Sequence, residues 1–118
     1  MILVDTSVWV HHFRKGNARL AALLEATEAV THPMILGELA CGGLPDRART
    51  LHLLRALPLV EPAPDSIVLN TIETHRWRNT GFGWIDAHLL TAALTQSIPI
   101  LTLDRGLARA ASALGLTA

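Results

Sequence analysis

Cysteine is almost missing from this chain of 118 residues, in which only Cys41 occurs. A single cysteine forms no disulfide within the chain and offers no cluster for structural zinc. The six histidines do not compensate, because none lies in an H-E-x-x-H pattern or beside a cysteine at zinc-ligand spacing. We therefore expect no histidine ligand, a reducing cytoplasm as the compartment, and a Cys41 that packs as a small buried apolar residue.

Long apolar runs are absent as well. The uncharged stretches are far shorter than the ~20 residues that span a bilayer, and the N-terminus resembles a strand rather than a signal peptide. Half of the residues are nevertheless apolar, which is enough to build one core at this chain length. The expectation is a soluble, cytoplasmic protein with a single domain over residues 1–118.

Net charge is also missing, since ten basic residues balance ten acidic ones. Bulk charge therefore predicts no polyanion partner. Nine of the ten basic residues are arginine, which binds phosphate well. Genomic base composition accounts for this bias better than phosphate binding does, so the arginines alone indicate no function.

What the sequence does contain is a regular alternation of strand and helix patterns. Strand-like runs lie at residues 2–4, 29–31 and 98–103, with a brief strand or a plain link at 59–60. Helical patterns between them begin near capping residues or proline and mostly end near glycine. They cover residues 7–13 with Ser7 as the cap, a stretch after Asn17, 33–41, 46–57 with Asp46 as the cap, 65–79, 84–96 and 105–115. Strands separated by helices pair in parallel, so the sequence predicts an α/β three-layer sandwich with a short, mainly parallel central sheet flanked by helices.

The ten acidic residues divide into two groups by their neighbours. Six lie among polar residues, prolines or helix caps, where a solvated surface role explains them: Glu25, Glu28, Asp46, Glu61, Asp65 and Glu73. The other four stand in the apolar stretches MILVD, MILGELA, WIDAHLL and ILTLD: Asp5, Glu38, Asp86 and Asp104. Carboxylates are rarely buried without a partner, so these four require an explanation.

Two explanations remain open for these four acids. Each taken alone is accounted for equally well as a helix cap, a first-turn residue or a salt-bridge member. Taken together, their positions favour a shared site, because Asp5 and Asp104 follow the two best strands, where ligands bind in open parallel sheets. Asp86 begins a helix after a glycine-containing loop, and Glu38 lies on a helix that must cover the sheet. Acids that converge without basic partners repel one another unless a cation neutralises them, which favours a magnesium site for phosphate chemistry.

The stretches that hold these acids resemble a known family. MILVDTSVW, ILGELACG, GWIDAHLLTAA and ILTLDRGLA occur in the order found in PIN-domain ribonucleases, specifically in VapC-type toxins of type II toxin–antitoxin pairs. The resemblance implies a PIN-like fold and a metal-dependent endoribonuclease that uses Mg²⁺, with Mn²⁺ as a substitute. It also implies RNA as the substrate, a cognate antitoxin as a protein partner, and a homodimer.

The resemblance further implies a role for each matching residue. Asp5, Glu38, Asp86 and Asp104 correspond to the catalytic acidic quartet. Asp5 and Asp86 would be the most direct metal ligands, Asp104 would complete the metal site, and Glu38 would orient water or a second ion. Thr6 and Thr102 match hydroxyl positions that support the site. The chain ends soon after LGLTA, so the last edge strand of many relatives is expected to be very short here.

Two residues near the acids are candidates for substrate binding. Trp84 lies two residues before Asp86 at the predicted rim of the site, where it could stack on a base, although packing is the alternative. Arg105 directly follows Asp104 and is the preferred phosphate contact.

Two other functional classes are compatible with an acidic site on a parallel sheet. A catalytically silent module would use the acidic pocket to hold a basic peptide, for which fewer acids would be enough. A phosphotransfer receiver or small phosphatase is less favoured. DTSVW lacks a second aspartate two residues after the first, and the sole lysine, Lys15, does not follow the last strand.

Overall fold

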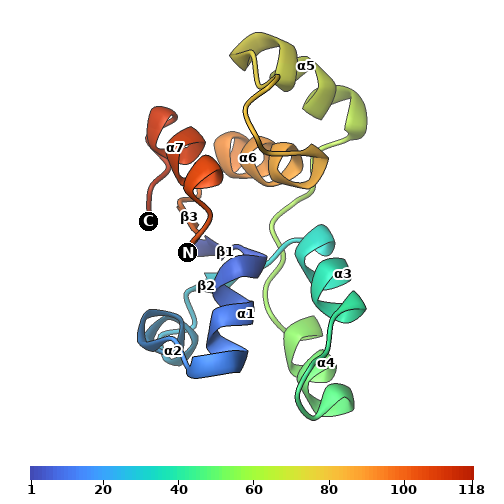
Figure 1. Ribbon diagram of the computed structural model, residues 1–118, viewed down its shortest axis with the longest axis vertical. Helices are drawn as coiled ribbons and strands as arrows, with labels where there is room; N and C mark the ends of the chain where they lie inside the picture. The colour runs from blue at the N-terminus through green and yellow to red at the C-terminus, as the bar shows by residue number, and fades with distance from the viewer.

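The computed structural model describes residues 1–118 and contains three strands and seven helices (Figure 1). The strands are β1 (Ile2–Val4), β2 (Ala29–Val30) and β3 (Ile100–Leu101). The helices are α1 (Thr6–Lys15), α2 (Ala18–Glu25), α3 (Pro33–Cys41), α4 (Arg47–Arg55), α5 (Asp65–His75), α6 (Trp84–Gln96) and α7 (Arg105–Ala113). β1 is the central strand and pairs in parallel with β2 on one side and β3 on the other. The predicted α/β architecture with a short parallel sheet is therefore confirmed.

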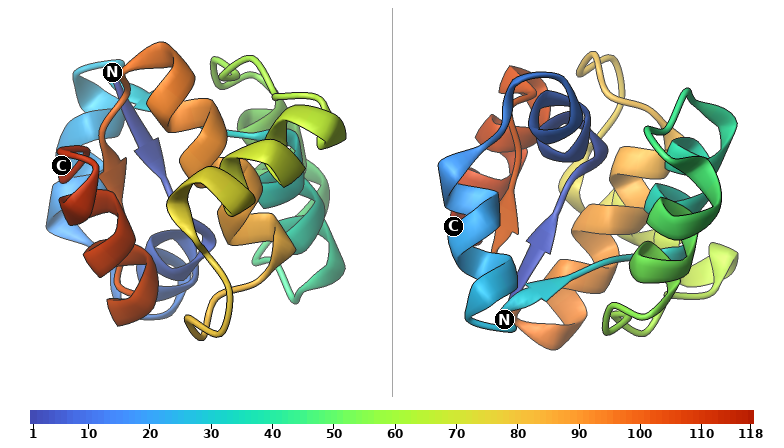
Figure 2. Two further views of the ribbon diagram at one scale, coloured as in Figure 1. Left: turned by 90° about the horizontal axis from the view of Figure 1, so that it is seen from above. Right: turned by 90° about the horizontal axis from the view of Figure 1, so that it is seen from below.

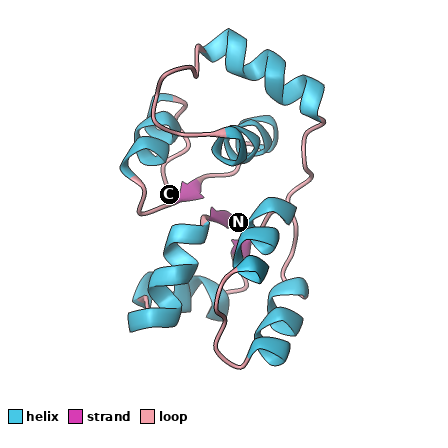
Figure 3. Ribbon diagram, turned by 45° about the vertical axis from the view of Figure 1, so that its right-hand side comes forward, coloured by secondary structure: helices cyan, strands magenta, loops and turns pink.

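The sheet lies between two layers of helices. Figure 2 shows α2 and α7 on one side of the strands and α3, α4, α5 and α6 on the other, and Figure 3 shows how small the sheet is relative to the helices. Leu3 and Val4 of β1 are fully buried, as are Leu89 and Leu90 of α6. These residues belong to one core cluster of 21 buried residues, which fixes the strands relative to the helices. None of the helices is long and apolar enough to cross a membrane.

Single-residue bridges extend the sheet at both edges. Thr31 pairs in parallel with Leu59, so residues 59–60 form a bridge rather than a full strand. On the other edge Ile100 pairs with Thr117, and the amide of Ile100 donates to the carbonyl of Leu116 over 2.8 Å. Pairing on this edge therefore consists of one bridge.

Three local predictions were wrong, and a fourth, the Asp46 cap, holds for its position but not for its hydrogen bond. Helix α1 begins at Thr6 and is capped by Asp5 rather than Ser7, because the Asp5 carboxylate accepts a bond from the Ser7 amide. Asp46 occupies the cap position of α4 but makes no capping hydrogen bond. Helix α5 ends at His75, before residue 79, because Arg76 takes a left-handed conformation with φ 56°. Cys41 is exposed rather than buried because it lies at the last turn of α3 and faces solvent.

Candidate active site

Asp5 is the most buried of the four predicted acids, with 6% of its surface exposed at the carboxyl end of β1. Its Oδ2 accepts hydrogen bonds from Ser7 Oγ at 2.7 Å and from Thr102 Oγ1 at 2.8 Å. The Ser7 amide adds a longer contact of 3.4 Å to the same oxygen. These donors compensate the burial of a charged carboxylate and fix its orientation. They leave Oδ1 without a protein hydrogen-bond donor, so this oxygen is available to a ligand.

Asp104 is tied to Asp5 through the same hydroxyls. Its amide donates to Thr102 Oγ1 at 3.0 Å, and the amide of Leu103 donates to Ser7 Oγ at 3.0 Å. The Asp104 carboxylate caps α7 by accepting from the Leu107 amide at 2.8 Å. Residues separated by nearly the whole chain are therefore joined where β1 and β3 end.

Ser7 is the functional residue that the sequence analysis missed. The sequence treats Ser7 as a helix cap, whereas in the structure its hydroxyl links Asp5 to the segment that leads into Asp104. The available signal was a second hydroxyl two residues after Asp5, a spacing at which side chains in a helical first turn bond to the capping residue.

Glu38 reaches the site from α3. Its Oε1 accepts a hydrogen bond from Thr6 Oγ1 at 2.7 Å. Thr6 is the first residue of α1, so this bond connects the start of α1 to the middle of α3. The bond holds one carboxylate oxygen and leaves Oε2 without a protein donor.

The pKa of Asp86 is affected by the charges of the other three acids. It lies in the first turn of α6, and the Gly83 amide donates to its Oδ2 at 3.3 Å. Burial is the main cause that raises the pKa of Asp86, while the Gly83 bond opposes the shift. The negative charges of Asp5, Asp104 and Glu38 raise this pKa further. The three other acids that the sequence selected therefore act electrostatically on Asp86.

No basic side chain neutralises this group. The only ion-pair contact in the structure joins His88 and Asp65, so no arginine or lysine lies within 4.0 Å of a carboxylate oxygen of the four acids. Asp5, Asp86 and Asp104 lie at helix N-termini, as the alternative of helix caps and first-turn residues predicted. None of the four acids is in a salt bridge. Capping does not exclude a shared site, because Asp5 and Asp104 cap α1 and α7 while Ser7 and Thr102 join their two segments.

The donor set suits a hard divalent cation. Carboxylate oxygens flanked by hydroxyls are the ligands that Mg²⁺ and Mn²⁺ take in proteins. As the side chains stand, no group of three acidic, histidine or cysteine residues is arranged to hold one ion. Magnesium commonly uses only one or two carboxylates and keeps several waters, so the residues fit such an ion without a closed protein cage.

The two predicted substrate-binding residues lie at the first positions of two different helices, α6 and α7. Trp84 is 40% exposed and lines a shallow hollow with Glu38, Cys41 and residues of α3. Its indole packs edge-on against the imidazole of His88, with ring centroids 4.5 Å apart. Trp84 is therefore partly packed against the protein and partly exposed. Arg105 is the exposed first residue of α7 and forms no ion pair. Both side chains are accessible to a ligand.

Two histidines, His32 and His88, are buried and face each other with ring centroids 6.1 Å apart. His88 Nε2 is 3.1 Å from Asp65 Oδ1, but the contact lacks hydrogen-bond geometry and neither ring nitrogen has a partner. His32 caps α3 by accepting from the Met34 amide at 3.0 Å. Burial, together with the neighbouring His88, lowers the pKa of His32 to about 4.

The depressed pKa of His32 predicts acid sensitivity. The unfolded chain binds a proton at this residue below pH 6.5, whereas the folded chain stays neutral until about pH 4. The contribution of His32 to the free energy of unfolding is therefore fully present above pH 6.5. It falls by about 3 kcal/mol as the pH decreases toward 4. We expect His32→Asn, which keeps a capping acceptor, to flatten the difference in urea unfolding free energy between pH 7 and pH 4. The exposed His52→Asn variant is the control, and equal pH profiles for His32→Asn and the parent protein would contradict the expectation.

Comparison with known proteins agrees with this geometry. The sequence pattern of the PIN domain matches residues 2–113. Ribonuclease VapC32 of Mycobacterium tuberculosis is 38% identical over 117 residues, which are 98% of this chain and 94% of that protein.

Solved structures share the fold at lower identity. VapC20 of Mycobacterium tuberculosis, described as a toxin that cleaves the sarcin–ricin loop, has a TM-score of 0.66 at 20% identity and covers 99% of this chain and 97% of its own. FitAcB of Neisseria gonorrhoeae has a TM-score of 0.64 at 21% identity and covers 95% of this chain and 94% of its own. The sequence match over nearly the whole chain, with the short parallel sheet and four converging acids, shows that this chain belongs to the PIN-domain family and is a homologue of the VapC-type ribonucleases.

Proposed function

We propose that this chain is a metal-dependent endoribonuclease and the toxin of a type II toxin–antitoxin pair. The observation that carries the proposal is the 38% identity to ribonuclease VapC32 over 98% of the chain. The hydroxyls of Ser7 and Thr102, which join Asp5 to the segment that leads into Asp104, support it, as does the absence of a basic residue paired with the acids. A cation bound among these acids would offset their mutual repulsion at neutral pH. The homology to VapC32 supports RNA as the substrate and an antitoxin as the partner.

Asp5 and Asp86 are the residues that would hold Mg²⁺ directly, with Mn²⁺ as a substitute, and Asp104 would complete the metal site. When bound, such an ion stabilises the charge on the phosphoryl oxygens and promotes deprotonation of water. Ser7 and Thr102 hold Oδ2 of Asp5, so Oδ1 is the oxygen presented to the ion. The caps of α1 and α7 fix Asp5 and Asp104 before any ligand arrives. This preorganisation lowers the cost of assembling the site.

Glu38 is the residue that would orient and deprotonate the attacking water. Thr6 holds Oε1, and Oε2 remains free to accept a proton. Water oxygen adds to phosphorus opposite the leaving O3′, the P–O3′ bond breaks, and O3′ takes a proton from solvent. The products are a 5′-phosphate and a 3′-hydroxyl, with no covalent enzyme intermediate. Arg105 would contact a phosphate of the substrate and Trp84 a base.

A substrate without the 2′-hydroxyl tests this chemistry. We expect cleavage of a single-stranded RNA to persist when the 2′-oxygen at the scissile position is methylated, because the nucleophile is water. The same reaction should stop with EDTA and recover when Mg²⁺ or Mn²⁺ is added in excess. Product ends are read by mass spectrometry after gel electrophoresis. Loss of cleavage on 2′-methylation, or a cyclic phosphate product, would instead indicate a metal-free ribonuclease.

The toxin role has a separate test. A reading frame next to the gene that encodes a short DNA-binding protein would supply the antitoxin. Co-expression of the two proteins should give a complex that purifies together and has no ribonuclease activity.

A further inference from the structure

A pocket outside the acidic site lies between α7 and the segment that joins α5 to α6. It has a volume of about 420 Å³ and is lined by His75, Arg76, Trp77, Thr80, Phe82, Gly106, Arg109, Ala110, Ala113 and Leu114. This size is typical of sites for small ligands. None of the residues in the acidic quartet lines it, and neither do Trp84 or Arg105.

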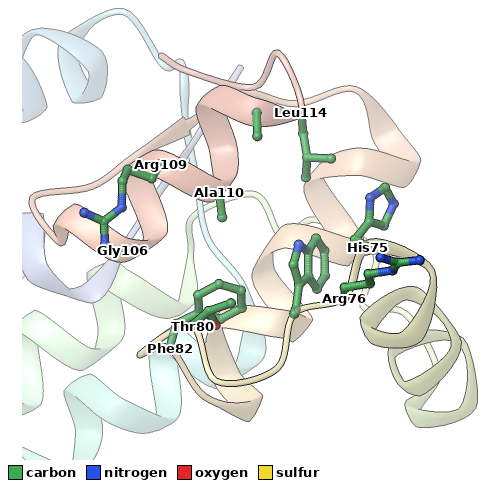
Figure 4. Close-up of a pocket in the computed structure, with 10 residues that line it drawn as sticks. His75, Arg76, Thr80, Phe82, Gly106, Arg109, Ala110 and Leu114 are labelled. Carbon is green, nitrogen blue, oxygen red and sulfur yellow. The ribbon is translucent and has the colours of Figure 1, made fainter.

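The charged residues that line the pocket are all basic. Arg76 and Arg109 contribute two guanidinium groups, and no aspartate or glutamate lines the cavity. Neither arginine is in an ion pair or a side-chain hydrogen bond, so both are free to bind. Figure 4 shows them at opposite ends of the pocket in that view, with Phe82 and Thr80 facing the helix that bears Arg109. Two separated cations of this kind fit an anion with more than one charged group, as in a chain of phosphates.

Between the arginines the lining is aromatic. The indole of Trp77 stacks on the imidazole of His75, with ring centroids 5.1 Å apart and planes at 20°. Phe82 meets Trp77 edge-on at 5.9 Å. Both Trp77 and Phe82 are only half-buried, so part of each ring remains open. Aromatic side chains beside arginines are the combination that binds the bases and phosphates of single-stranded nucleic acids.

The pocket shares its walls with the elements that carry two of the catalytic acids. Gly106 lies in the first turn of α7, where an added Cβ would come within 3.3 Å of Asp104 Oδ1. Thr80 and Phe82 lie just before α6, which carries Asp86. The left-handed conformation of Arg76 ends α5 and turns residues 75–77 toward α7. A ligand in the pocket is therefore next to the acidic site.

We propose that this pocket binds one nucleotide of single-stranded RNA beside the cleaved bond, with the base against Trp77 and Phe82 and the flanking phosphates on Arg76 and Arg109. The inference rests on the proposed ribonuclease function and adds a substrate subsite to it. It also places part of the substrate specificity in the segment 75–82, which precedes α6.

Binding is measured without cleavage, in an Asp5→Asn background, by fluorescence anisotropy of a labelled single-stranded RNA heptamer of random sequence. Arg109→Gln should raise Kd about fivefold or more and reduce the salt dependence by about one phosphate contact. Arg55→Gln is the matched control, since it removes one exposed helical arginine that forms no ion pair and lies outside the pocket. Its Kd should stay within about twofold of the parent.

The aromatic part of the pocket has its own pair of variants. Trp77→Leu should raise Kd about fivefold or more, whereas Trp77→Phe keeps a ring and should change it less. Thermal unfolding followed by circular dichroism verifies that each variant is folded, and Arg109→Gln carries the test if Trp77→Leu is not.

Three results would contradict the proposal that the pocket binds RNA. These are an equal change in Kd for Arg109→Gln and Arg55→Gln, an unchanged Kd for Arg109→Gln, and no binding of the heptamer at all. Failure of the proposed function is distinguished from these results, because it appears as absent cleavage by the parent protein with Mg²⁺ or Mn²⁺.

Discussion

Asp5→Asn is expected to reduce RNA cleavage at least about a hundredfold, because it removes the charge at the most buried position of the acidic group. The amide oxygen of asparagine can still accept the bonds from Ser7 and Thr102 and can still cap α1. The fold should therefore be retained while the affinity for the cation falls. The measurement is the initial rate of RNA cleavage at saturating Mg²⁺, together with the thermal unfolding temperature.

Asp46→Asn provides the matched control for this variant. Asp46 also stands at the N-cap of a helix, but it is exposed and makes no capping hydrogen bond. Its amide variant should retain the parent's activity. If Asp5→Asn kept parental activity, the acidic group would not be a nuclease site. If the parent itself showed no cleavage and yet bound a basic peptide, the binding module would be the better interpretation.

Asp86→Asn is expected to abolish cleavage and at the same time stabilise the metal-free protein. The pKa of Asp86 is raised in the folded state, so its ionised form is less favourable there than in the unfolded chain. The contribution of Asp86 to the free energy of unfolding is thus present at low pH and is lost as the pH rises through the raised pKa of the folded state. Replacing the carboxylate with a neutral amide removes that loss, and the bond from the Gly83 amide can remain. The unfolding temperature in EDTA at pH 7 should rise.

Adding Mn²⁺ tests whether Asp86 takes part in binding the cation. A cation that binds only the folded state adds about 2.7 kcal/mol at a concentration of one hundred times its Kd. Mn²⁺ should therefore raise the unfolding temperature of the parent by several degrees and that of Asp86→Asn much less. Glu61→Gln, at an exposed position away from the site, is the control and should respond like the parent. An equal shift in all three proteins would place the cation elsewhere.

Much of the site was predictable because its acids stand out against apolar neighbours. Asp5 and Asp104 follow strand patterns, and parallel strands end at the same edge of a sheet, so their proximity followed from the topology. Thr102 was assigned to the site from the resemblance to the family, and in the structure its hydroxyl donates to Asp5. Ser7 was not assigned, because a hydroxyl after a strand serves a helix cap and a carboxylate equally well.

Residues whose roles depend on burial were harder to predict. Cys41 lies on an apolar helix, yet it is exposed because only one face of α3 packs on the core. His32 and His88 are polar by composition and almost fully buried in the structure. The pocket between α7 and residues 75–82 joins segments about 30 positions apart, and no local pattern marks their contact.

The sequence by itself determined the order of strands and helices and singled out four acids in apolar stretches. These properties depend on local periodicity and on residue chemistry, which neighbours along the chain reveal. Tertiary structure alone decided that Ser7 and Thr102 share one oxygen of Asp5, that the other three charges act on Asp86, and that two arginines frame an aromatic pocket. The physical reason is that crossovers between parallel strands bring distant residues into contact, and contacts of this kind leave no signal in any single stretch of sequence.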